Sequence, residues 1–132
     1  MKTKISTLII PVLFVGLLTG CAATSADKVT ITEQDAGKTI TLKTGDTLIV
    51  SLEGNMTTGF SWIPATQTPV LLEQVGEVAV TPVSNAIGAP GKILLQFKAT
   101  EKGQTNLHLD YKRSWEQGVA PAKTFDVTVV VK

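Results

Sequence analysis

The single cysteine and the single histidine of this 132-residue chain are its first candidates for chemistry, as a nucleophile with its base or as metal ligands. The sequence supports neither role. Cys21 directly follows an N-terminal apolar run, and no cluster of further metal-ligand residues accompanies His108. His108 alternates with Leu107 and Leu109 along residues 105–111, so we expect it on the solvated face of a strand.

No other residue pattern indicates catalysis. The sequence has no glycine-rich phosphate loop before a helix and no serine in a nucleophile elbow. Its twelve Lys and Arg and eleven Asp and Glu form no basic stripe, which argues against nucleic-acid binding. We therefore predict a monomeric protein that is not an enzyme and that carries no cofactor and no metal ion.

The N-terminal residues are typical of an export signal. Two lysines precede an almost uncharged apolar stretch, residues 5–18, which is too short for a stable membrane-spanning helix. The Leu-Thr-Gly-Cys21 that ends it resembles the lipobox of bacterial lipoproteins, in which the cysteine is lipidated and the preceding peptide is removed. The alternative is a plain signal peptide with an incidental cysteine. We predict a signal peptide over 1–20, a lipidated cysteine with a short tether over 21–27, and one domain over 28–132.

A lipid on Cys21 would hold the protein at a membrane of the cell envelope. Ala22, and not Asp, follows the cysteine, which resembles lipoproteins that are sorted to the outer membrane of a Gram-negative host. Because the only thiol is then used, no intramolecular disulfide can form. A packed apolar core must therefore stabilise the domain.

The domain alternates apolar and polar residues with a period of two, the pattern of half-buried strands. The extended segments cover residues 29–31, 40–42, 48–52, 59–63, 70–80, 93–99, 105–111 and 125–131. Turn residues separate them, many members are Thr or Val, and no segment predicts a helix. Seven or eight short strands in a domain of this length predict an all-β fold, an immunoglobulin-like β-sandwich.

Three long connections are expected at one end of this sandwich, because strands that alternate in direction place successive connections at opposite ends. We name them the first loop (residues 53–62), the second loop (81–91) and the third loop (112–118). The tight turns near Gly45 and Gly103 belong to the other end. Loops displayed by a rigid sheet commonly carry binding residues, so we expect the function at the three-loop end.

The three loops carry motifs that resemble those of the chagasin family of cysteine-protease inhibitors. The family's Asn-Pro-Thr-Thr-Gly-aromatic, Gly-x-x-Gly and Arg-Pro-Trp motifs correspond, in order, to Asn55-Met56-Thr57-Thr58-Gly59-Phe60, to Gly88-Ala89-Pro90-Gly91 and to Arg113-Ser114-Trp115. The similarity extends over roughly residues 28–132. Three motifs in order are far more specific than any one of them, and the resemblance implies that these residues bind a protease.

The resemblance also implies a mechanism, the reversible inhibition of a papain-like cysteine protease by occlusion of its cleft. The backbone at Gly59 would approach the catalytic thiolate, with the hydroxyls of Thr57 and Thr58 nearby. The second loop would lie against one wall of the cleft, and Trp115 would stack on the other. The inhibitor supplies no chemistry, so a preorganised edge and a buried tryptophan must provide the affinity.

Two residues depart from the family pattern. Met56 and Ser114 stand where the family has prolines, which restrict the backbone and reduce the entropy that a loop loses on ordering. Each replacement is expected to weaken binding by about 0.5–1 kcal/mol. The affinity therefore falls without an obvious loss of binding, which leaves room for a partner other than the family's usual one.

Several of these residues also have a purely structural interpretation. The first-loop threonines can cap a turn, and Gly88–Gly91 can be a simple turn. Phe60 can belong to the core or support the loop, Trp115 can cover the edge of the core, and Trp62 is expected inside the core. The alternative function is an envelope-anchored, immunoglobulin-like module that binds a protein or a glycan without inhibiting a protease.

Overall fold

The computed structural model describes Gly16 and residues 25–132. The predictions for lipidation at Cys21, for the signal peptide and for the first part of the tether lie outside the described residues. The described elements, in order, are β1 (Lys28–Thr32), η1 (Glu33–Asp35), β2 (Thr39–Leu42), β3 (Thr47–Gly54), η2 (Met56–Thr58), β4 (Ser61–Pro64), β5 (Leu72–Gln74), β6 (Ala79–Pro82), β7 (Gly91–Ala99), β8 (Gly103–Lys112) and β9 (Lys123–Val131). Within this part of the chain, no helix is long and apolar enough to cross a membrane.

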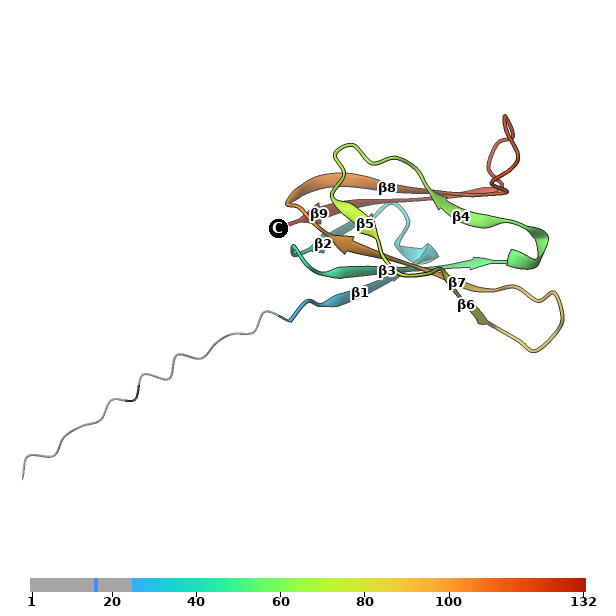
Figure 1. Ribbon diagram of the computed structural model, residues 1–132, viewed down its shortest axis with the longest axis horizontal. Coiled ribbons are helices and arrows are strands. Elements are labelled where there is room, and N and C mark those ends of the chain that lie inside the picture. Colours follow the sequence, from blue (N-terminus) through green and yellow to red (C-terminus); the bar gives the residue numbers. More distant parts are fainter. Residues whose placement is uncertain (1–15, 17–24) are drawn as a thin grey trace, which may run out of the picture.

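Two β-sheets pack face to face (Figure 1). One has the strand order β1-β3-β7-β5, with β6 also paired to β7, and the other has the order β2-β9-β8-β4. The predicted all-β sandwich is confirmed, but the described residues form nine strands instead of seven or eight. The difference arises in residues 70–80, predicted as one extended stretch, because Gly76 adopts a left-handed φ of 70° and divides it into β5 and β6.

The first two strands belong to different sheets. β1 pairs in parallel with β3, and β2 pairs in parallel with β9. The single-turn 3₁₀ helix η1 carries the chain across, and a capping box holds it: Thr32 accepts from Gln34 N, and Asp35 accepts from Thr32 N. The sequence predicted no helix here, because a turn of three residues is too short to leave a helical period.

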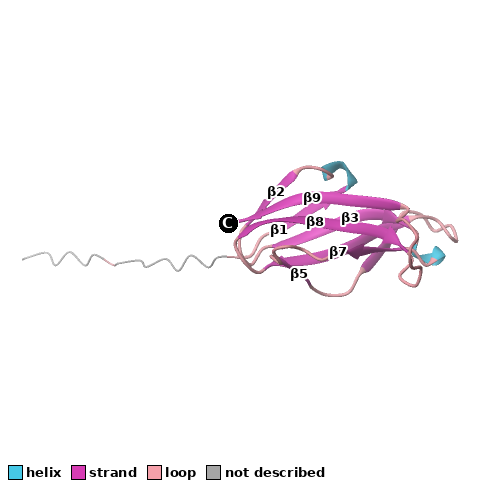
Figure 2. Cartoon of the chain, turned by 90° about the horizontal axis from the view of Figure 1, so that it is seen from above, coloured by secondary structure: helices cyan, strands magenta, loops and turns pink. Residues whose placement is uncertain are grey.

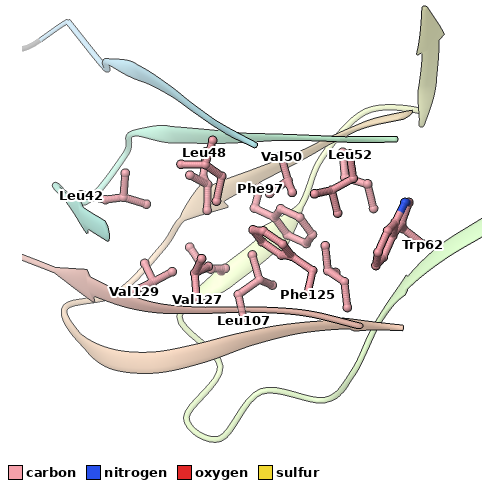
Figure 3. Close-up of a cluster of buried hydrophobic side chains, with 14 of the residues drawn as sticks. Leu42, Leu48, Val50, Leu52, Trp62, Phe97, Leu107, Phe125, Val127 and Val129 are labelled. Carbon is pink, nitrogen blue, oxygen red and sulfur yellow. The ribbon is translucent and has the colours of Figure 1, made fainter. Parts of the chain in front are cut away.

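The core lies between the sheets, where the apolar members of each alternating segment face one another. Figure 3 shows Leu48, Val50 and Leu52 of β3 opposite Phe125, Val127 and Val129 of β9. Trp62 is buried with them, as expected, and its indole N–H donates to Glu53 O at 3.2 Å. Full burial of one such large apolar side chain contributes about 1.5–3 kcal/mol, so this core is the main source of the domain's stability.

The three loops share one end of the sandwich, as predicted. They lie opposite the C-terminus and the start of β1 (Figures 1 and 2). At the other end, tight turns tie the strands together: Gly45 N donates to Ala99 O at 2.8 Å, and Thr44 N donates to Lys132 O at 3.2 Å. The 3₁₀ helix η1 also reaches the loop end, where the Glu33 carboxylate accepts from Glu53 N.

Candidate functional site

The first loop contains a tight turn that its own side chains stabilise. Asn55 is the N-cap of η2, and its Oδ1 accepts from Thr57 N at 3.1 Å and from Thr57 Oγ1 at 2.5 Å. Thr58 Oγ1 donates to Asn55 O at 2.7 Å. Gly59 ends the turn with φ +83°, a left-handed conformation that favours glycine. Asn55 thus caps the turn, the threonine hydroxyls brace it by donating to Asn55, and both threonines remain exposed.

A side-chain amide connects the first loop to the second. Asn55 Nδ2 donates to Gly88 O at 2.9 Å, and Asn55 N donates to Tyr111 OH of β8 at 2.8 Å. Within the second loop, Ala89 N donates to Ala86 O at 3.2 Å. A cavity of about 300 Å³ lies between the two loops, and residues of both loops line it. The first and second loops therefore form one hollowed edge.

A guanidinium connects the first loop to the third. Arg113 Nε donates to Thr58 O at 3.0 Å, and Arg113 Nη1 donates to Glu116 Oε1 at 3.0 Å. The guanidinium also lies over the Phe60 ring, 4.5 Å from its centroid, and Phe60 in turn stacks on Tyr111 at 5.2 Å. Such a stack favours a flat, delocalised cation, which arginine supplies and lysine does not. Phe60 therefore lies between Arg113 and Tyr111 and supports the first and third loops.

Trp115 is the exposed aromatic side chain of the three loops. It is 67% exposed, and the edge of its indole rests against Gly59 of the first loop. The interpretation of Trp115 as a cover for the core edge is therefore wrong. The freedom of Gly59 serves its left-handed φ and the close approach of this indole, whereas the resemblance had assigned that freedom to approach by a partner.

The structure places the predicted residues in one cluster at the loop end, with two qualifications. Gly91 is buried as the first residue of β7, and an added Cβ would lie 2.8 Å from Thr81 O, so its lack of a side chain serves strand pairing. Ala89 is half-buried, while Pro90 and Ser114 are exposed. The predicted residues that are exposed are therefore 56–58, 88, 90, 114 and 115.

Two supporting residues escaped the sequence analysis. The alternation of residues 105–111 predicts Tyr111 as one more core-facing member of a strand, but its hydroxyl also accepts the Asn55 N–H. Glu116 holds Arg113 from within the third loop. Two signals in the sequence could have indicated these roles. Tyr111 is a tyrosine among leucines beside a loop motif, and Glu116 is a carboxylate three residues after an arginine.

His108 differs from its expected role as a simply solvated residue. It lies on the outer face of β8, and its side chain is 34% exposed. Nδ1 lies 2.5 Å from Asp126 Oδ1, and Nε2 lies 2.9 Å from Asp110 Oδ1. The hydrogen bond with Asp126 is the largest effect and raises the pKa of His108 above its ordinary value. Burial opposes this effect, and the hydrogen bond with Asp110 raises the pKa further. Among the described residues, no group of His, Cys, Asp and Glu side chains could hold a metal ion.

The sandwich presents three loops that hydrogen bonds join, with an exposed tryptophan among them. This arrangement is typical of a protein that binds another protein through its loops. Residues 41–129 match the family described as Chagasin family peptidase inhibitor I42, and the chain therefore belongs to the chagasin family of peptidase inhibitors. This match confirms the resemblance seen in the three motifs.

Individual relatives agree with the family assignment. The chain is 31% identical to amoebiasin-1 of Entamoeba histolytica over 102 residues, which are 77% of this chain and 98% of the relative. It is 27% identical to amoebiasin-2 of the same organism over 113 residues, 85% of this chain and 92% of the relative. The fold is similar to the crystal structure of a cysteine protease inhibitor from Entamoeba histolytica, with a TM-score of 0.69, 23% identity, and coverage of 81% of this chain and 97% of the other.

Proposed function

We propose that this peptidase inhibitor acts on papain-like cysteine proteases and that it blocks the active-site cleft reversibly with its three loops. One observation carries the proposal: hydrogen bonds from Asn55 and Arg113 join the three loops into a single edge, from which Trp115 projects at 67% exposure. One solved structure of similar fold is that of a cysteine protease inhibitor, which supports the same class of target.

The edge acts by fit and not by chemistry. Residues 56–59 enter the cleft as a turn whose backbone is already bonded to Asn55 and Arg113. The second loop lies on one wall of the cleft, and Trp115 stacks on the other wall. Because these contacts keep the edge ordered before it binds, docking costs little conformational entropy, and a modest contact area can bind tightly.

A titration against papain tests the proposal. The protein should be produced without lipid, beginning at Ala22, and should inhibit papain or a cathepsin-type protease at sub-micromolar concentration, with full recovery of activity on dilution. A folded domain that leaves a panel of such proteases uninhibited would contradict the proposal. That outcome would favour the alternative, a module that binds an envelope protein or a glycan without inhibition.

We propose further that lipid on Cys21 anchors the inhibitor in the cell envelope, at the outer membrane if the host is Gram-negative. β1 begins at the end of the sandwich opposite the loops (Figure 1), so a tether attached there leaves the loops facing away from the membrane. Replacement of Cys21 by Ala should move the protein from the membrane fraction to the soluble fraction. Wild-type protein that is already soluble would contradict the anchor.

A further inference from the structure

We propose that Asn55 is a positioning residue, one that sets the second loop against the first and does not itself contact the protease. This inference rests on the proposed function and deepens it. The amide of Asn55 can take part in four hydrogen bonds, and three are made within the protein: one to Gly88 O and two from Thr57. Asn55 is also half-buried, so little of it is free to meet a partner.

The tip of the second loop has little else to hold it. Pro82 and Gly91 form the last pair between β6 and β7, and almost every residue between them is exposed, with Ile87 fully so. Gly88 follows Ile87 with φ +77°, and a Cβ added to it would meet no atom within 4 Å other than those of its chain neighbours. Among the described residues, the bond from Asn55 Nδ2 to Gly88 O is the one side-chain hydrogen bond between the first and second loops.

Asn55 is in turn held in place from the sheet. Its backbone N–H donates to Tyr111 OH, and Tyr111 is a buried residue that stacks on Phe60 and packs at a tilt against Trp62. The Asn55 side chain therefore connects Gly88 to the core. This source of loop order does not depend on a proline at position 56, and Met56 follows directly in this chain.

The substitution Asn55→Asp removes the hydrogen bond to Gly88 O and keeps the one that caps η2. Aspartate keeps an oxygen that can accept from Thr57, but it has no N–H for Gly88 O. We expect lower backbone order parameters, measured by NMR relaxation, at Gly88 and Ala89 of the free protein. We also expect an inhibition constant for papain about tenfold higher than that of the wild type. The matched control is Asn106→Asp, the same change on the outer face of β8, which should alter neither quantity.

The two measurements distinguish the possible outcomes. Both should be repeated at high salt, because salt screens the added charge and does not restore a lost N–H donor. Weaker inhibition with unchanged order at Gly88 and Ala89 would make Asn55 a contact residue and overturn the inference. Unchanged order and unchanged inhibition would overturn it as well. If the wild type does not inhibit papain, the proposed function fails, while the relaxation data still decide whether Asn55 orders the second loop.

Discussion

The indole of Trp115 rests on Gly59, so closely that a Cβ on residue 59 would stand 2.4 Å from Trp115 Cη2. The third loop is thus seated on the first through a contact that only glycine permits. One part of the indole is held by the protein, and the remainder is exposed. A tryptophan held in this way before binding loses less rotational freedom when a partner covers it.

Replacement of Gly59 by Ala should therefore weaken both stability and inhibition. The left-handed φ of +83° costs an alanine about 1 kcal/mol or more, and the new methyl group must displace the indole. We expect a lower free energy of unfolding in urea and an inhibition constant at least tenfold higher. Gly76→Ala is the control, since Gly76 has φ +70° in open space. The Gly76→Ala variant should lose stability by a similar conformational cost and should inhibit like the wild type. Equal inhibition by Gly59→Ala and Gly76→Ala would contradict the role of the contact between Trp115 and Gly59.

Replacement of Trp115 by Ala tests the exposed part of the indole. If Trp115 is a binding hot spot, inhibition of papain should weaken by about 2 kcal/mol, roughly thirtyfold in the inhibition constant. The thermal midpoint should change little, because the side chain is 67% exposed. Val70→Ala removes an exposed apolar side chain from outside the three loops and should inhibit like the wild type. An unchanged inhibition constant for Trp115→Ala would remove this residue from the contact surface.

His108 predicts a dependence of stability on pH. Its carboxylate neighbours, Asp126 and Asp110, raise its pKa in the folded state, so folding favours the protonated form. This contribution is fully present below the unfolded pKa of about 6.5 and is lost as the pH rises through the folded value. The difference in unfolding free energy between wild type and His108→Gln should therefore be larger at pH 6 than at pH 8.5. A difference that is constant across this range would show that the imidazolium is not stabilised by the two carboxylates.

Replacement of Phe97 by Ala tests the core that supports the loops. Phe97 is 1% exposed between the sheets, and truncation of such a side chain removes its burial and leaves a cavity. We expect the free energy of unfolding, measured by urea denaturation, to fall by about 3–5 kcal/mol. Val119→Ala, at a residue 59% exposed, should stay within about 0.5 kcal/mol of the wild type. A small loss for Phe97→Ala would mean that the sheets can close over the missing ring.

The pairing of the strands could not be predicted from the alternation of apolar and polar residues. Gly76 divides residues 70–80, but the pairing of both pieces, β5 and β6, with β7 depends on the sheet. The separation of β1 from β2 likewise depends on which sheet offers each one an edge. Propensity and alternation are equal for either arrangement. The pairing of distant strands makes the choice.

The sequence by itself determined the all-β class, the residues that face the core, and the three motifs at one end, because alternation and turn chemistry are local properties of the chain. Only the tertiary structure decided how the loops are held to one another. Asn55 and Gly88 are 33 residues apart, and Thr58 and Arg113 are 55 apart. Their hydrogen bonds depend on the register of β3 with β7 and of β4 with β8, which packing of the whole sandwich sets.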